Sequence, residues 1–127
     1  SALLLPGDPD RSAQTLREEI YRKIGKSVGV LISDSMNRPW RLGTVGSAIG
    51  CAGIQVIHDF RGTEDMFGRE LKVAMLNRAD SLVATATLLM GETIERTPIV
   101  LVRGFPATDT LEAAADMIRP LEDDLFR

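Results

Sequence analysis

The segment 43–53, GTVGSAIGCAG, limits the possible folds of this chain more than any other stretch, because glycine recurs at positions 43, 46, 50 and 53. In a helix, these four glycines would cost roughly 3–4 kcal/mol relative to alanine. In a strand, glycine lets another part of the backbone approach closely. The sequence therefore predicts a strand or extended chain here, packed closely against a neighbouring element. No glycine of the segment is followed by the lysine and then serine or threonine that a phosphate-binding P-loop requires.

The rest of the chain alternates between helical and extended patterns. Apolar residues at steps of three and four, followed by Gly25, predict an amphipathic helix over 10–24. A second helix is predicted from Asn77 or Asp80 to Gly91. Its apolar face comprises Leu82, Val83, Ala86, Leu89 and Met90. Strands are predicted at 27–33, 54–60, 69–77 and 97–104, loops at 34–42 and 61–68, and a third helix near 109–118. This order predicts an α+β fold with a mixed or antiparallel sheet and about three helices.

Composition narrows the class of protein. The chain has 127 residues and a formal net charge of −3, with arginines and acidic residues interspersed, so the electrostatic footprint of a nucleic-acid binder is absent. The single cysteine, Cys51, cannot form a disulfide within the chain and lies among small apolar residues, which is typical of a buried thiol in a reducing compartment. No apolar run reaches the length of a membrane span, and no signal peptide is visible. We therefore expect a cytoplasmic protein.

Residues 32–41, ISDSMNRPWR, form the most unusual polar stretch. Asp34 and Ser35 follow a predicted buried strand and offer the hard oxygen ligands that Mg²⁺ prefers. Arg38 and Arg41 flank a proline and a tryptophan, so they could clamp a carboxylate or phosphate. We expect Trp40 to be partly buried and to hold the arginines in place. An ordinary turn with solvated arginines remains the alternative, because Asp and Ser also favour turns.

Two further residues are candidates for chemistry. Glu92 follows the second predicted helix, where the helix dipole disfavours a carboxylate unless a cation or water compensates it. Asp34 and Glu92 are therefore a possible metal-binding pair. His58 is the only histidine, so it could shuttle a proton, but a structural or exposed role is the commoner alternative.

Five segments carry a resemblance to a known family: LLLPGDPDRSAQTLREEI, ISDSMNRPWRLGTVGSAIGCAGI, DFRGTEDMFGREL, RADSLVATATLLMGE and PIVLVRG. In this order they resemble the coenzyme F420-0:L-glutamate ligases, also called gamma-glutamyl ligases. The resemblance runs from Leu3 to about Gly104, and RPWR and AIG-x-AG are its specific elements.

The resemblance implies a GTP-dependent amide ligase that adds L-glutamate to a deazaflavin precursor and extends its gamma-glutamyl tail through an acyl-phosphate. It implies Mg²⁺ or Mn²⁺, an assisting monovalent cation such as K⁺, a homodimer, and no nucleic-acid or membrane partner. The site residues that it implies are Asp34, Ser35 and Glu92 for metal; Arg38 and Arg41 for catalysis; Met90, Gly91, Glu92 and Thr93 for the nucleotide; and Trp40, Arg61 and Asp65 for substrate.

The chain departs from the family in two respects. Asn37 replaces the glycine usual before RPWR. Family members are also about twice as long, so the resemblance implies that residues 1–127 are a single domain, equivalent to the C-terminal half of a larger two-part fold and inactive by itself. A non-catalytic nucleotide-binding, metal-binding or assembly module is the alternative. A metal-dependent phosphohydrolase with Asp34 as nucleophile fits less well, because Met36 stands where that motif needs a second acid.

Overall fold

The computed structural model describes residues 4–124 and begins with a long helix, α1 (Pro9–Ile24). Asp8 caps its N-terminus, where the Asp8 carboxylate accepts a hydrogen bond from the Arg11 amide at 2.9 Å. Gly25 ends the helix in the left-handed conformation, with φ 66°. The helix predicted over 10–24 is thus confirmed.

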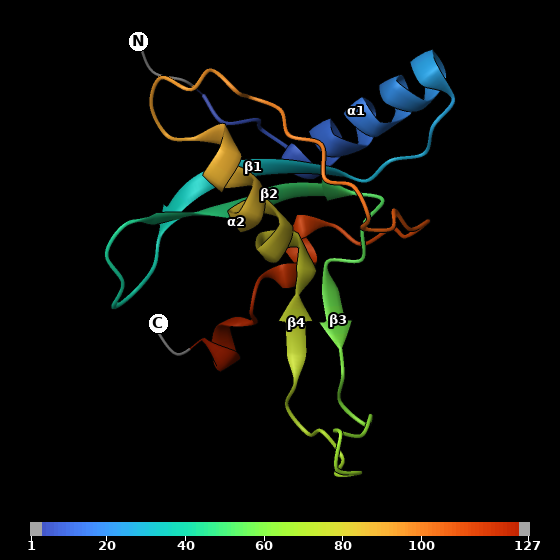
Figure 1. Cartoon of the computed structure of the whole chain (residues 1–127), viewed down its shortest axis with the longest axis vertical. Coiled ribbons are helices and arrows are strands. Elements are labelled where there is room, and N and C mark those ends of the chain that lie inside the picture. Colours follow the sequence, from blue (N-terminus) through green and yellow to red (C-terminus); the bar gives the residue numbers. More distant parts are fainter. Residues whose placement is uncertain (1–3, 125–127) are drawn as a thin grey trace.

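The glycine-rich segment forms strand β2 (Thr44–Ala52), which pairs antiparallel with β1 (Val30–Asn37). The predicted close packing is also confirmed. A Cβ atom on Gly50 would lie 2.4 Å from the Pro9 carbonyl oxygen at the start of α1. A Cβ atom on Gly46 would lie 2.0 Å from the Thr87 hydroxyl of α2 (Arg78–Met90). The β1–β2 ribbon therefore lies between the two helices, as Figure 1 shows.

A β-bulge in β2 places two nearby glycines, Gly46 and Gly50, against different helices. Ile32 pairs with Gly50 and Ser33 with Ala48, so Ile49 is the extra residue of β2. Without the bulge, positions 46 and 50 would share a face, because side chains alternate along a strand. With the bulge, Gly46 faces α2 and Gly50 faces α1.

A second ribbon leads into α2. Strands β3 (Ile57–Asp59) and β4 (Met75–Asn77) pair antiparallel, and the hairpin that they begin extends away from the β1–β2 ribbon (Figure 1). Asn77 caps α2, accepting a hydrogen bond from the Asp80 amide at 2.9 Å. The second helix is therefore confirmed at its predicted start.

Several predicted elements differ from the structure. The strands predicted at 54–60 and 69–77 are reduced to β3 and β4. Strand β1 runs on to Asn37, through part of the predicted loop 34–42, because β2 pairs with it as far as Asn37–Thr44. The strand predicted at 97–104 is absent from the described chain, where the segment has no partner strand. The helix predicted near 109–118 is reduced to a 3₁₀-helix at Ala114–Met117, followed by another at Leu121–Asp123. Leu111 is fully exposed, and a short helix without packing is marginal in water.

The core is small and made mainly of small side chains. Its buried cluster comprises Cys51, Ile54, Val56, Ala79 and Ala114. On α2, Val83 is buried, but Leu89 is 68% exposed, so the predicted apolar face of this helix is only partly correct. The α+β class is confirmed, with antiparallel pairing in both ribbons. Within residues 4–124, no helix has the length and apolar character needed to cross a membrane.

Candidate functional site

Ser35 and Glu92, which are far apart in the sequence, meet in the structure. The Ser35 hydroxyl donates a hydrogen bond to a Glu92 carboxylate oxygen at 2.5 Å. The Thr44 hydroxyl donates to the same oxygen at 3.5 Å. Ser35 lies on β1 and Thr44 opens β2, while Glu92 follows α2. Gly46 is the partner of Ser35 in the sheet, and α2 packs on the ribbon at Gly46. Glu92, which follows α2, therefore lies on the face of the ribbon that carries Ser35.

Asp34 does not join this pair. Its carboxylate accepts a hydrogen bond from the Ser35 amide at 2.8 Å. Neighbouring residues of a strand point to opposite faces, so Asp34 lies on the face of β1 opposite Ser35. The side chain that the structure brings to Glu92 is that of Ser35, and a shared metal site of Asp34 and Glu92 stays a prediction.

The segment after α2 lines a shallow, open hollow of about 460 Å³. Gly91 opens it with φ 72°, and a Cβ atom there would lie 2.1 Å from the Glu95 carboxyl carbon. Glu95 accepts a hydrogen bond from the Thr93 amide at 2.9 Å, which lowers the pKa of the Glu95 carboxyl. The predicted nucleotide segment, residues 90–93, therefore lines one side of this hollow.

Arg96 also lines the hollow and was missed by the sequence analysis. It adopts φ 51°, a left-handed conformation that side chains other than glycine rarely take. Arg96 therefore brings a positive charge to the hollow that Glu92 also lines. Its sequence context, TIERTP, contains no motif that would have identified it.

The arginine turn lies at the tip of the β1–β2 ribbon. Arg38 and Arg41 are exposed, and the Arg41 amide donates to the Arg38 carbonyl oxygen at 3.3 Å. Trp40 has φ 59° and is 88% exposed, so the prediction that it is partly buried is wrong. The turn projects beyond the ribbon, where no other described element covers it (Figure 1). Thr44 closes the turn and reaches Glu92, so the arginines and the Ser35–Glu92 pair occupy the same end of the ribbon.

Arg61 and Asp65 are engaged within the β3–β4 hairpin. Arg61 holds Asp59 through a 2.6 Å ion pair, and this contact lowers the pKa of Asp59 to about 2. Asp65 accepts hydrogen bonds from the amides of Phe67 and Arg69 at 2.8 and 3.0 Å. Neither residue is brought to Ser35 and Glu92, because the hairpin extends away from that ribbon (Figure 1).

The histidine and the cysteine have structural surroundings. His58 contacts the Arg78 guanidinium through Nδ1 and stacks on Phe60, with ring centroids 4.1 Å apart. Cys51 is buried, and burial together with the charge of Asp10 raises the pKa of its thiol to about 11. The prediction of Cys51 as a small buried residue is confirmed, and its high pKa disfavours a nucleophilic role.

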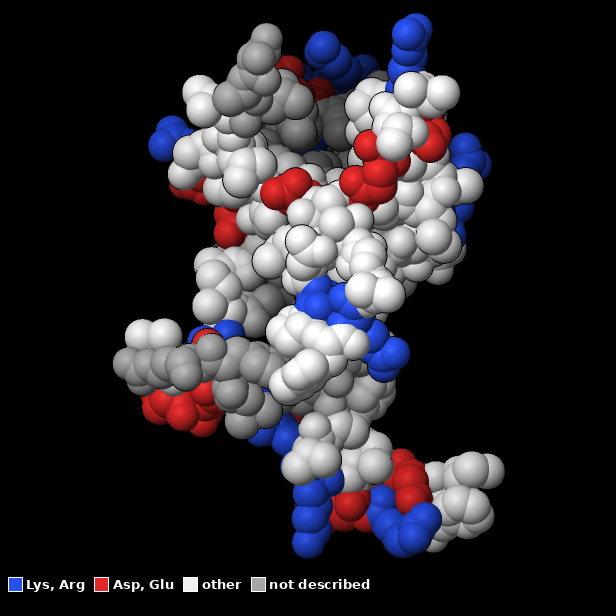
Figure 2. All heavy atoms as spheres, turned by 90° about the vertical axis from the view of Figure 1, so that its left-hand side faces the viewer, with Lys and Arg blue, Asp and Glu red and all other residues white. Residues whose placement is uncertain are grey.

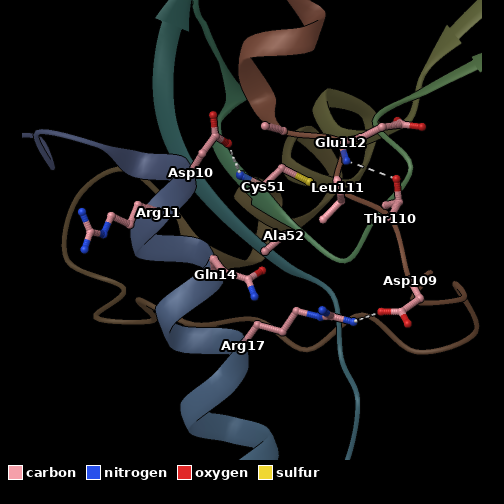
Figure 3. Close-up of a pocket in the computed structure, with 11 residues that line it drawn as sticks. Asp10, Arg11, Gln14, Arg17, Cys51, Ala52, Asp109, Thr110, Leu111 and Glu112 are labelled. Carbon is pink, nitrogen blue, oxygen red and sulfur yellow. Dashed lines mark hydrogen bonds and ion pairs between the residues drawn. The ribbon is translucent and has the colours of Figure 1, made fainter.

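A cavity of about 580 Å³ lies between α1, the end of β2 and residues 109–113 (Figure 3). Several of its polar groups are already engaged by the protein. The Asp10 carboxylate accepts the Cys51 amide at 2.8 Å, and Arg17 binds the Val28 carbonyl oxygen at 3.0 Å and Asp109 at 3.4 Å. These contacts join the helix to the sheet and to the C-terminal segment, so the cavity wall is mainly structural.

The Ser35–Glu92 cluster has the donor chemistry of a hard cation site. It combines one carboxylate with the hydroxyls of Ser35 and Thr44, all oxygen ligands. Within residues 4–124, no group of three or more His, Cys, Asp or Glu side chains could hold a metal ion. One carboxylate and two hydroxyls could supply only a few ligands, so water or phosphate oxygens would have to complete the coordination of an ion such as Mg²⁺.

Fold and site together describe an α+β protein with an oxygen-lined cluster beside an exposed pair of arginines. The comparison with known families is more specific, since the profile described as F420-0:Gamma-glutamyl ligase matches residues 1–104. The chain belongs to this family.

Curated relatives agree with this assignment. The chain is 47% identical over 124 residues to the coenzyme F420:L-glutamate ligase of Methanocaldococcus jannaschii and 43% identical over 129 residues to that of Methanopyrus kandleri. The alignments cover 98% of this chain but only 50% and 51% of the two relatives. The chain thus spans about half the length of these relatives, and it corresponds to their C-terminal half.

Proposed function

We propose that this chain supplies the C-terminal half of a GTP- and divalent-metal-dependent ligase that adds L-glutamate to coenzyme F420-0 and extends its gamma-glutamyl tail. The names of the relatives support the ligase class and the coenzyme. One structural observation carries the assignment of the site: the 2.5 Å contact between Ser35 and Glu92 at the arginine end of the β1–β2 ribbon.

The proposed chemistry has two steps. The γ-phosphoryl group of GTP passes to a carboxylate oxygen of the acceptor, so one P–O bond breaks, another forms, and GDP leaves. The amine of glutamate then attacks the acyl carbon, the C–O bond to phosphate breaks, and the nitrogen loses a proton. Such reactions depend mainly on positioning and on stabilisation of negative charge, so the protein needs no nucleophile of its own.

Each part of the site has a role in this proposal. Ser35 and Glu92 hold the divalent ion, with Asp34 as a further candidate on the opposite face of β1, and residues 90–93 contact the nucleotide. When bound, Mg²⁺ or Mn²⁺ supplies positive charge to the phosphate groups. Arg38 and Arg41 bind anionic groups of the substrates, because guanidinium groups match carboxylates and phosphates. An assisting K⁺ and a homodimer belong to the same proposal.

A non-catalytic nucleotide-binding or assembly module is the second candidate. The observation that favours it is the Ser35–Glu92 cluster, which could bind a cation or a nucleotide without catalysing a reaction. A half without its counterpart could retain the Ser35–Glu92 cluster and still lack part of the substrate site. The two candidates predict different behaviour once the counterpart is present.

The test is to co-express the chain with the N-terminal half of the M. jannaschii relative and to incubate the purified pair with coenzyme F420-0, L-glutamate, GTP and Mg²⁺. Mass spectrometry should detect a product heavier by one glutamyl residue, and omission of GTP should abolish it. The chain alone should give no product. A folded pair that binds GTP but forms no product would overturn the ligase proposal and favour the module.

A further inference from the structure

We infer that residues 98–103, PIVLVR, are an edge strand that pairs with a strand of the N-terminal half found in the relatives. We call these residues the 98–103 segment. The inference rests on family membership and goes beyond the proposed activity, because it concerns an interaction surface rather than the reaction.

The 98–103 segment has the composition of a strand. Ile99, Val100 and Val102 are β-branched, and such residues are enriched in strands. Pro98 stands at the first position, where a strand tolerates proline. Local sequence therefore favours an extended, paired backbone.

The structure leaves this segment extended but unpaired. It contains no assigned strand, and among residues 4–124 no backbone–backbone hydrogen bond joins it to another segment. The next such bond along the chain is donated by the Thr108 amide to the Gly53 carbonyl oxygen at 2.9 Å. In Figure 1 the segment is part of the long orange trace, which joins neither ribbon. Its amide and carbonyl groups are thus available for a partner strand.

Apolar side chains in the segment are exposed. Ile99 is 83% exposed, Leu101 68% and Val102 42%, while Val100 is partly buried. Residues at i and i+2 of a strand share a face, so Ile99 and Leu101 form one apolar face that is open to solvent. Figure 2 shows one side of the molecule, on which acidic and basic residues form small separate groups among uncharged residues. The exposed side chains of Ile99 and Leu101 are apolar, so they suit an apolar interface better than a charged ligand.

The length of the relatives identifies the occupant. The family profile extends to residue 104 and so includes the segment, which is therefore part of the shared C-terminal half. What the relatives have in addition is their other half. The segment belongs to neither of the two two-stranded ribbons. A strand from the other half would pair with its free amide and carbonyl groups, and side chains of that half would pack on Ile99 and Leu101.

Hydrogen exchange tests the inference without any substrate. The chain is compared alone and co-purified with the N-terminal half of the M. jannaschii relative. We expect all amides of residues 99–103 to exchange rapidly in the chain alone, and every second one to exchange at least tenfold more slowly in the pair, because successive amides point to opposite edges. No added protection, or no pair at all, would overturn the inference. Protection in the chain alone, accompanied by a dimer in sedimentation, would also overturn it in favour of a second copy of this chain.

Matched variants locate the pairing edge. Amides point to alternate edges along a strand, so one of Val100→Pro and Arg103→Pro should remove a hydrogen bond to the partner while the other should not. We expect one of the two variants to weaken the pair at least tenfold. Equal binding by both variants and by the original chain would contradict strand pairing.

A second comparison tests the apolar face. Leu101→Asn should weaken the pair at least tenfold, whereas Leu111→Asn, at a fully exposed leucine outside the segment, should not. Circular dichroism melts of the free chain should be unchanged by either variant, which separates loss of binding from loss of folding. Because these measurements need neither GTP nor glutamate, a pair that shows strand protection but no ligase activity would refute the proposed function and leave this inference standing.

Discussion

Asp10 ties three separate parts of the chain together through one carboxylate. One of its oxygens accepts hydrogen bonds from the Cys51 amide of β2 at 2.8 Å and from the Ala114 amide at 2.7 Å. The other oxygen accepts the Ala115 amide at 3.3 Å. A residue that the sequence shows only as the start of a helix thus joins α1 to the sheet and to the C-terminal segment.

We predict that Asp10→Asn lowers the free energy of unfolding by about 2 kcal/mol, because charge-assisted hydrogen bonds are lost. The new amide also places a donor opposite another donor. Urea denaturation measures the change. Asp109→Asn is the control: its side chain is fully exposed and makes one 3.4 Å ion pair with Arg17, so the effect should be below about 0.5 kcal/mol. Equal effects of the two variants would refute the special role of Asp10.

Asp59 gives a second prediction at this scale. Its carboxylate is held by the Arg61 side chain and by the Arg61 amide, which lower its pKa to about 2. A lowered pKa means that the contribution to stability is complete above the ordinary value of 3.8 and is lost as the pH falls towards 2. Carboxyl chemical shifts measured by NMR should show Asp59 titrating near pH 2, and near its ordinary value in Arg61→Ala. Titration near 3.8 in the original chain would contradict the ion pair.

At the scale of elements, the packing of α1 on β2 depends on the absence of a side chain at Gly50. A Cβ atom there would meet the carbonyl oxygen and carbon of Pro9, which are backbone atoms and cannot rotate away. This contact sets the distance between the helix and the ribbon.

Gly50→Ala should therefore destabilise the chain by about 2 kcal/mol or more, in the range of overpacked cores. Gly7→Ala is the matched control, because a Cβ atom at Gly7 meets nothing within 4 Å. Thermal melts of the two variants make the comparison. If Gly50→Ala melted like the control, the close approach of α1 to β2 would be wrong.

The sequence predicts helices and strands well where interactions between neighbouring residues determine their position. The cost of glycine in a helix is local, and so are the capping hydrogen bond of Asn77 and the stop at Gly25. It predicts helices and strands poorly where pairing with a segment distant in the sequence determines them. Strand β1 extends through Asp34 because β2 pairs with it, and residues 97–104 are not a strand because no described segment pairs with them.

The candidate site shows the same division. Sequence patterns nominate Ser35 and Glu92 separately, but their contact joins residues 57 positions apart and depends on how α2 crosses the ribbon. Trp40 was expected to be partly buried because of its size, yet the turn that carries it projects beyond the ribbon. Which element covers a turn is a property of tertiary structure, and local sequence does not encode it.

At the scale of the whole molecule, the described chain buries few large side chains. Val56 is the largest side chain that is fully buried, whereas leucines and isoleucines in several segments are strongly exposed. Examples of these are Leu4, Leu88, Ile94, Ile99 and Leu111. Burial of apolar surface is the main favourable term in folding, so this chain has a reserve of uncovered surface that a partner could use.

We predict that the pair formed with the N-terminal half of the M. jannaschii relative melts at least about 10 °C above the chain alone, because a partner that binds only the folded state stabilises it by several kcal/mol. Differential scanning calorimetry measures both samples. Lysozyme at the same concentration serves as a non-binding control. A melting temperature unchanged by the N-terminal half would show that the exposed apolar surface is not its docking site.

The most direct test of the central claim is the Mg²⁺ dependence of glutamate addition by the same pair, measured by mass spectrometry for the original chain and for Glu92→Gln. If Glu92 holds the ion beside Ser35, the variant should need at least tenfold more Mg²⁺ for half-maximal product, or form none. Glu122→Gln, at an exposed residue near the C-terminus, should match the original chain. Product formation by Glu92→Gln with unchanged yield and unchanged Mg²⁺ dependence would contradict the assignment of this site.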